Sequence, residues 1–209
     1  MTATLIGLTG KKRTGKDTVA ARLVSHHGFV RVAFADPLKE AALGLDPLIR
    51  IAQDETGPLA EHGLRITAAP VGSTMRLAHL IDLVGWEAAK EVREVRRTLQ
   101  RYGVAIRDLT PSYWLDQALA KAAELLVTGT SVVIADVRFP NELEAIKAHG
   151  GFHWHVDRPA FAPVADPHPS ETALEPFYTD ADCWIQNTGS VQALDCLVDA
   201  IGAGTWGPA

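Results

Sequence analysis

The sequence lacks most features that mark secreted, membrane-spanning and nucleic-acid-binding proteins. Its 209 residues include only two cysteines, Cys183 and Cys196, so neither a disulfide framework nor a zinc site is indicated, and we expect two buried thiols. No apolar run approaches the roughly 20 residues of a membrane span, and no leader pattern opens the chain. The formal net charge of -5 argues against nucleic acid as a partner. We therefore expect a cytoplasmic protein that binds neither nucleic acid nor membrane.

Internal repeats and low-complexity segments are also absent. The hydrophobic content of 47% and the charged content of 22% are ordinary for a globular protein, so neither a disordered nor a fibrous chain is indicated. A chain of 209 residues can fill one core and still carry a small inserted subdomain.

The order of the predicted elements is typical of a parallel α/β sheet. Residues 4–9 are apolar strand formers that end at a glycine-rich turn. Apolar residues at helical spacing predict a helix over 15–27, and 29–35 is a second strand. A strand, turn, helix and strand in this order open a sheet whose parallel strands are flanked by helices.

The remaining sheet segments lie in the last third of the chain. The pattern predicts strands at 131–136, 152–156 and 183–186, with helices at 141–149 and 191–201. Boundaries of this kind are accurate to a few residues.

The stretch from about 36 to 125 contains no convincing strand. Its apolar spacing predicts helices near residues 37–44, 73–84, 86–101 and 112–127. We expect a single domain with a core at about 1–36 and 128–209 and a helical insertion at about 37–127. Residues 158–172 hold four prolines and no apolar period, which predicts a loop.

Residues 10–18 have the spacing G-x-x-x-x-G-K of a phosphate-binding loop, or P-loop. Glycines let successive N–H groups point at phosphate oxygens, and a helix beginning at Gly15 adds its N–H groups and its dipole. Lys16 is expected to reach the β- and γ-phosphates. The position between a buried strand and a helix favours this interpretation over a basic surface turn. The expected ATP-binding residues here are Gly10, Lys11, Arg13, Thr14, Gly15, Lys16, Asp17 and Thr18.

Asp17 stands where most P-loops have the serine or threonine that binds magnesium. A carboxylate is a good oxygen ligand for magnesium, directly or through water, and Lys11, Lys12 and Arg13 can offset its charge. The alternative is a simple partner for the helix dipole in the first turn. Thr18 is expected to touch the α-phosphate.

Asp136 ends the strand at 131–136, where a Walker-B-like carboxylate belongs at the carboxyl edge of a parallel sheet. We expect it to hold a magnesium-bound water, and a carboxylate that caps the next helix is the alternative.

Arg138 is a candidate for binding a transferring or acceptor phosphate. Arg158 precedes the proline-rich loop, which is placed to act as a lid over ATP, and would bridge phosphates there.

Residues 6–18 and 34–39 resemble the phage-type deoxynucleoside monophosphate kinases. The runs at 136–142, 168–171 and 187–190 are similar to that family too, so the resemblance extends over most of the chain. It makes Asp17 a family trait. It implies a P-loop NTPase fold with a helical substrate-binding insertion and a lid loop. It also implies ATP and a deoxynucleoside monophosphate as partners and Mg²⁺ as cofactor. The family resemblance further implies a homodimer, and a location in the host cytoplasm if the chain is phage-encoded.

The resemblance also implies roles for single residues. Lys39 would contact the acceptor phosphate, and Asp36 would either orient the substrate or cap a helix ahead of Pro37. Glu142 would face the nucleotide site, although helix capping is a sufficient explanation. Asn187 would belong to the adenine-side loop, although a turn explains it equally well.

The insertion is rich in arginine, which can hold a phosphate with two hydrogen bonds. Most of these arginines are expected to pair with nearby glutamates on the surface. We select Arg101 and Arg107, because residues 99–107 and the following Trp114 look like the family's substrate segment. Glu171 lies in a polar cluster with His168 and Ser170 and is a further candidate for substrate binding. No strand-turn-helix elbow surrounds Ser170, so a hydrolase triad is not indicated.

Phosphoryl transfer needs positioning and cations more than covalent help from the protein. A monophosphate acceptor has its second pKa near about 6 and needs no general base, whereas a hydroxyl acceptor would need one, for which Asp36 is the candidate. Our first hypothesis is ATP-dependent phosphorylation of deoxynucleoside monophosphates to diphosphates. The alternatives are another small P-loop kinase, of the dephospho-coenzyme A or phosphomevalonate kinase type, and a non-catalytic nucleotide-binding regulator.

Overall fold

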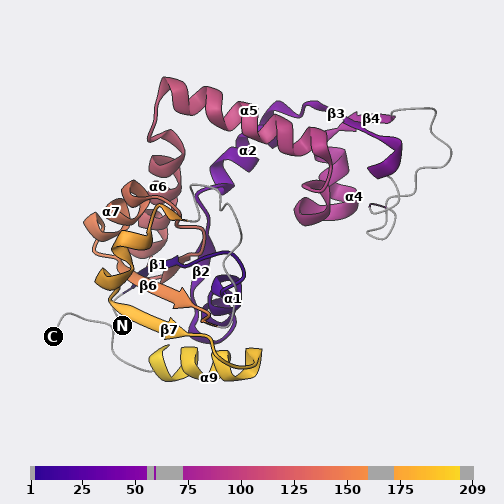
Figure 1. Cartoon of the computed structure of the whole chain (residues 1–209). Helices are drawn as coiled ribbons and strands as arrows, with labels where there is room; N and C mark the ends of the chain where they lie inside the picture. Colours follow the sequence, from indigo (N-terminus) through magenta and orange to yellow (C-terminus); the bar gives the residue numbers. More distant parts are fainter. Residues whose placement is uncertain (1–2, 56–58, 60–72, 160–171, 203–209) are drawn as a thin grey trace. The chain divides into compact units, whose positions relative to one another are not determined.

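The computed structural model describes residues 3–55, 59, 73–159 and 172–202 (Figure 1). The chain divides into two compact units. Unit 1 comprises Met1–Phe34 and Leu115–Ala209, and unit 2 comprises Ala35–Trp114. Within the described ranges, no helix is both long and apolar enough to cross a membrane.

Unit 1 is built on a five-stranded sheet in the order β2-β5-β1-β6-β7. All its pairings are parallel, as the sequence predicts. The strands are β1 (Leu5–Thr9), β2 (Val30–Val32), β5 (Val132–Ile134), β6 (Phe152–Asp157) and β7 (Cys183–Gln186). Because parallel strands end at the same edge, the residues that follow β1, β5, β6 and β7 can form one site.

The three central strands, β1, β5 and β6, are buried on both faces, so alternate residues enter two separate cores. Ile6 and Leu8 pack with α1 (Lys16–His27) and α9 (Val191–Gly202). Leu5 of β1, with Val132 and Ile134 of β5, packs with α6 (Tyr113–Val127) and α7 (Pro140–Ala148) on the other face. The two helix pairs thus sandwich the sheet (Figure 1).

A charged cluster holds α9 against α1. Arg22 Nε on α1 donates to Asp199 Oδ1 on α9 at 2.8 Å, and His27 Nε2 lies 2.9 Å from the same oxygen. The hydrogen bond from Arg22 holds the pKa of the Asp199 carboxyl well below its usual range. The two helices that flank the phosphate loop are therefore tied together.

Unit 2 corrects the expectation of an insertion without strands. Its elements are α2 (Asp36–Leu45), β3 (Leu48–Ile51), η1 (Gln53–Glu55), β4 (Ser73–Arg76), α4 (Leu77–Ala89) and α5 (Arg93–Leu109). Strands β3 and β4 pair antiparallel. In β3, exposed and buried residues alternate with a period of two, but four residues are too few for this pattern to stand out in the sequence.

Three further boundaries differ from the sequence prediction. The predicted helix at 73–84 is β4 followed by α4, and the helix predicted at 86–101 is α5, which ends at Leu109. The second unit boundary lies at Trp114 rather than near 127, because Ala118, Leu119 and Ala122 of α6 belong to the core of unit 1.

The cysteines also differ from expectation. Cys183 is half-buried on β7 and Cys196 is exposed on α9, and both are free thiols. The prediction of two buried thiols was therefore wrong for Cys196. An amphipathic helix has an exposed face, and Cys196 lies on it.

Candidate active site

The segment between β1 and α1 is a tightly wound phosphate loop. Gly10 has φ 134° and Gly15 has φ 111°, both in the region that favours glycine. A Cβ on Gly10 would lie 2.1 Å from the Val156 carbonyl oxygen, so the loop lies directly against β6. Helix α1 begins at Lys16, which aims the helix N-terminus, with its N–H groups and positive dipole end, at the loop.

Lys16 folds over this loop. Its Nζ donates to the carbonyl oxygens of Gly10 at 2.6 Å and Lys11 at 2.8 Å. Thr14 Oγ1 donates to the Lys11 carbonyl at 2.9 Å, which closes the turn from inside. The ammonium group therefore lies at the mouth of the loop, as a phosphate-binding lysine must.

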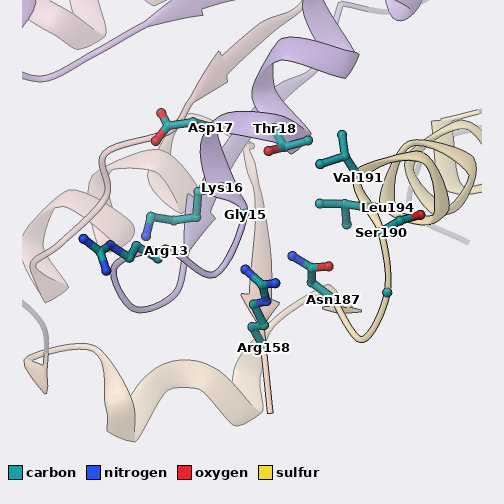
Figure 2. Close-up of a pocket in the computed structure, with 11 residues that line it drawn as sticks. Arg13, Gly15, Lys16, Asp17, Thr18, Arg158, Asn187, Ser190, Val191 and Leu194 are labelled. Carbon is teal, nitrogen blue, oxygen red and sulfur yellow. The ribbon is translucent and has the colours of Figure 1, made fainter. Parts of the chain in front are cut away.

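A pocket of about 460 Å³ opens beside the loop (Figure 2). Three cations line it: Arg13 and Lys16 from the loop, and Arg158 from the end of β6. Val191 and Leu194, at the start of α9, give it an apolar wall. A pocket with cations at one side and apolar side chains at the other fits a molecule that is both charged and apolar, as a nucleotide is.

Buried histidines lie under the start of the loop. Thr9, the last residue of β1, has its Oγ1 2.7 Å from His153 Nε2 and 3.1 Å from His155 Nδ1. Both imidazoles come from β6, which pairs with β1. Burial lowers the pKa of each histidine to about 4, so both are neutral at pH 7.

The chain after the proline-rich loop packs on one of these histidines, His155. The ring of Tyr178 lies 3.8 Å from the ring of His155, and Trp184 on β7 meets His155 edge to face at 4.7 Å. Lys11 of the phosphate loop forms an ion pair with Glu175 at 2.6 Å. The ion pair joins η2 (Glu175–Asp180) to the phosphate loop, and the ring contact of Tyr178 joins it to β6.

Asn187 lies on the other side of the loop. It is 8% exposed, and its Nδ2 donates to the Thr14 carbonyl oxygen at 2.9 Å. It also lines the pocket, together with Lys16 and Arg158.

Asp136 follows β5 at the same sheet edge. Its Oδ1 accepts a hydrogen bond from the backbone N–H of Phe34 at 3.0 Å. The N-cap of α7 is Phe139, so the alternative of Asp136 as the cap of that helix is wrong. A carboxylate that ties β5 to the chain after β2 fixes the position of both strand ends.

Glu142 closes the first turn of α7. Its Oε2 accepts from the backbone N–H of Arg138 at 2.7 Å and of Phe139 at 3.1 Å, which is the capping role expected from sequence. Burial raises the pKa of Glu142 to about 7, and the negative charge of Asp136 adds to the rise. The Arg138 side chain is exposed, and its backbone is held by Glu142.

Asp17 points away from Lys16 in Figure 2 and is paired with Arg31 on β2 at 2.6 Å. Its side chain is 82% exposed. Thr18 follows on α1 and lines the pocket. In the part of the chain that the structure describes, no three carboxylates, histidines or cysteines are grouped as a ready-made metal site.

In unit 2, Asp36 and Lys39 form an ion pair at 2.8 Å on the first turn of α2. The N-cap of α2 is Ala35, so the alternative of Asp36 as a helix cap is wrong. The carboxylate and the ammonium group are adjacent, and both are partly exposed.

Most arginines of α5 pair with acidic residues, as the sequence predicts. Arg93, Arg96 and Arg97 pair with acidic neighbours. Arg101 and Arg107 are exposed and have no ion pair with any residue that the structure describes. Six residues apart, they lie about 120° apart around the helix, so they do not share one face.

Trp114 lies inside unit 2. Its side chain is 6% exposed, and its Nε1 donates to the Gly103 carbonyl at 3.1 Å. The rings of Tyr102 and Tyr113 meet it edge to face. This geometry makes Trp114 the support of α5 at its junction with α6.

Two comparisons with known proteins bear on this site. The sequence model of the deoxynucleotide monophosphate kinase family matches residues 71–198, more than half of the chain. A relative from Acanthamoeba polyphaga mimivirus, whose name assigns it to the same kinases, is 31% identical over 172 residues, or 81% of each chain. The chain belongs to the deoxynucleotide monophosphate kinase family. The suspected family and the prediction of a nucleoside monophosphate kinase are thereby confirmed.

A solved structure supports the fold of this kinase. The dephospho-CoA kinase from Campylobacter jejuni superposes with a TM-score of 0.52 at 12% identity and covers 94% of each chain. The predicted P-loop α/β fold is confirmed. The phosphate loop at 10–18 precedes the residues that the family model matches, so its assignment depends on its own geometry.

Some predicted residues of the kinase lie outside the described residues. These are Glu171, its neighbours His168 and Ser170, and most of the lid loop predicted at 158–172. Arg65 of the insertion is also outside them.

Sequence reasoning missed the buried hydrogen bonds of Thr9 with His153 and His155, next to the phosphate loop of this kinase. The signal was present in the run Phe152-His-Trp-His-Val, where two histidines at spacing two share one face of a strand. A polar pair on a central strand, which is buried on both faces, needs a buried partner. Thr9 is that partner.

Proposed function

We propose that this kinase transfers the γ-phosphoryl group of ATP to deoxynucleoside monophosphates and releases deoxynucleoside diphosphates and ADP. The observation that carries the proposal is the pocket beside the phosphate loop, where Lys16, Arg13 and Arg158 meet the N-terminus of α1. Together with the family membership, this arrangement supports a nucleotide polyphosphate as the phosphoryl donor.

The loop would bind the β- and γ-phosphates through its backbone N–H groups. Lys16 donates to two loop carbonyls at 2.6 and 2.8 Å, and it would exchange these bonds for phosphate oxygens. That exchange replaces neutral acceptors with charged ones, which form stronger hydrogen bonds. Arg13 and Arg158 would orient the phosphate chain, and Val191 and Leu194 would contact the base and ribose.

The donor set fits magnesium in the manner usual for phosphoryl transfer, with one or two carboxylates and the substrate phosphates. Asp136, which follows β5, and Asp17 are the residues that we assign to it. Asp17 would take part by giving up its ion pair with Arg31. When bound, the ion would neutralise charge that develops on the phosphate oxygens.

The acceptor nucleotide would bind charged residues of unit 2. Lys39, Arg101 and Arg107 are the proposed contacts for the acceptor nucleotide, and Arg138 for a transferring or acceptor phosphate. A largely dianionic phosphate needs no proton removed, so no general base is required. We assign Asp36 to holding Lys39, with which it is paired at 2.8 Å.

A coupled assay of ADP release tests the reaction. ATP would be supplied with deoxynucleoside monophosphates, ribonucleoside monophosphates or dephospho-coenzyme A as acceptor. We expect the largest stimulation from a deoxynucleoside monophosphate. Stimulation only by dephospho-coenzyme A, or by no acceptor at all, would refute the proposal.

A substitution separates phosphate from hydroxyl acceptors. Asp36→Asn should raise the KM for the acceptor by a fewfold and leave kcat within about fivefold, because no proton transfer depends on it. The exposed Asp82→Asn on α4 is the matched control. A loss of kcat of about a hundredfold or more with unchanged acceptor KM would indicate a general base and a hydroxyl acceptor.

A further inference from the structure

Asn187 occupies a fixed position at the end of the sheet. It follows the last residue of β7, and its backbone N–H donates to the Asp157 carbonyl at 2.7 Å, which continues the pairing of β7 with β6. The side chain is buried between the loop after β7 and the phosphate loop. A short, buried side chain on a hydrogen-bonded backbone has little freedom to move.

The amide of Asn187 acts on one peptide group of the phosphate loop. Its Nδ2 donates to the Thr14 carbonyl oxygen at 2.9 Å, across 173 residues of sequence. A trans peptide is planar, so the carbonyl of Thr14 and the N–H of Gly15 point in opposite directions. Holding the carbonyl towards Asn187 therefore turns the Gly15 N–H away from Asn187.

The backbone of Gly15 lies close to the Asn187 side chain. Its φ is 111°, and a Cβ placed on it would lie 2.8 Å from Asn187 Nδ2 and 3.1 Å from a Leu194 methyl group. Asn187 and Leu194 therefore leave no room for a side chain at position 15. Figure 2 shows the amide of Asn187 directed at the phosphate loop, beside Arg158.

We propose that Asn187 is a positioning residue: its amide sets the orientation of the Thr14–Gly15 peptide, so that the Gly15 N–H is presented to the phosphate chain of the donor. The role deepens the proposed function and rests on it. It predicts that Asn187 governs the affinity for a polyphosphate whether or not a base is attached. A residue that only contacted adenine would affect ATP and leave a polyphosphate without a base unaffected.

The test measures binding of inorganic tripolyphosphate and of ATP by calorimetry. Asn187→Ala removes the donor and leaves the Thr14 carbonyl without it, and Asn187→Asp places a carboxylate oxygen against that carbonyl. Gln186→Glu is the matched control, since it adds the same charge at the exposed neighbouring position. Loss of one hydrogen bond to a buried group corresponds to a loss of affinity of about tenfold.

We expect both Asn187 variants to bind tripolyphosphate and ATP about tenfold more weakly, and the control to bind both as the wild type does. The KM for ATP should rise while the KM for the acceptor at saturating ATP stays unchanged, which a general loss of folding would not produce. Circular dichroism verifies that each variant is folded, and either folded variant suffices.

Three results would overturn the inference. Variants that bind tripolyphosphate normally but ATP weakly would make Asn187 a contact of the base, and variants that bind both normally would remove its role altogether. If the wild type itself fails to bind tripolyphosphate, the proposed polyphosphate site is refuted, and the role of Asn187 falls with it.

Discussion

The buried histidines beside Thr9 should make the stability of this kinase depend on acid. The folded protein lowers the pKa of His155 from 6.5 to about 4, because burial disfavours the charged imidazole. The unfolded chain binds the proton more readily, so acid favours unfolding. The stabilisation by the neutral form is present above about pH 6.5 and is lost as the pH falls towards about 4.

The magnitude follows from proton linkage. Each pH unit between the two pKa values corresponds to about 1.4 kcal/mol. Between about pH 7 and about pH 5, one histidine with these pKa values should contribute a loss of about 2 kcal/mol to the free energy of unfolding. His153, whose pKa is also lowered to about 4, should contribute a similar loss.

Urea unfolding followed by tryptophan fluorescence measures this loss at several pH values. In His155→Asn the loss between about pH 7 and about pH 5 should be smaller than in the wild type by about 2 kcal/mol. Titrating groups that lie away from Thr9 and its two histidines cancel in this comparison. His149→Asn, at the exposed C-cap of α7, should keep the dependence of the wild type. Equal losses in wild type and His155→Asn would refute the account of the buried network.

Two further substitutions test the loop and the first turn of α7. Gly10→Ala should weaken ATP binding in calorimetry by at least tenfold, because its Cβ would meet the Val156 carbonyl at 2.1 Å. Gly129→Ala, at another positive φ but with nothing within 4 Å, should leave binding intact, and equal binding by both variants would contradict the geometry. Glu142→Gln keeps a side-chain oxygen that can accept from the two backbone N–H groups. It removes a carboxyl group whose pKa is raised from 4.5 to about 7 in the folded protein. In the wild type, this raised pKa lowers the free energy of unfolding as the pH rises from 4.5 to about 7. Relative to wild type it should gain roughly 2 kcal/mol in urea unfolding between about pH 5 and about pH 7, and a parallel pH dependence would contradict that pKa.

The phosphate loop could be predicted because its information is local. The glycine and lysine spacing, the strand before it and the helix after it lie within the first 27 residues. The structure places Lys16, Arg13 and Thr18 around one pocket with Arg158 and Asn187, which the sequence had assigned to the same nucleotide. Order along the chain was enough for these residues, since parallel strands end at one edge.

The parts that the sequence did not predict depend on contacts between distant segments. Thr9 meets His153 only because β1 lies beside β6, and periodicity does not give the order of strands in a sheet. The strands of unit 2 are four residues each and are joined by a long connection, so neither has a pattern strong enough to detect. The resemblance assigned Trp114 to the substrate segment, but the spacing of residues does not show that its side chain is buried against the Gly103 carbonyl.

The central claim is that residues 10–18, with Lys16, hold the polyphosphate of the donor during transfer. The most direct measurement is the rate of ADP release, at saturating ATP and deoxynucleoside monophosphate, in wild type, Lys16→Ala and the exposed control Lys121→Ala on α6. We predict acceptor-dependent release in the wild type and the control, and a loss of at least about a hundredfold in Lys16→Ala, the usual scale for removing a group that stabilises charge in a transition state. A Lys16→Ala variant that turns over like the wild type would contradict the claim.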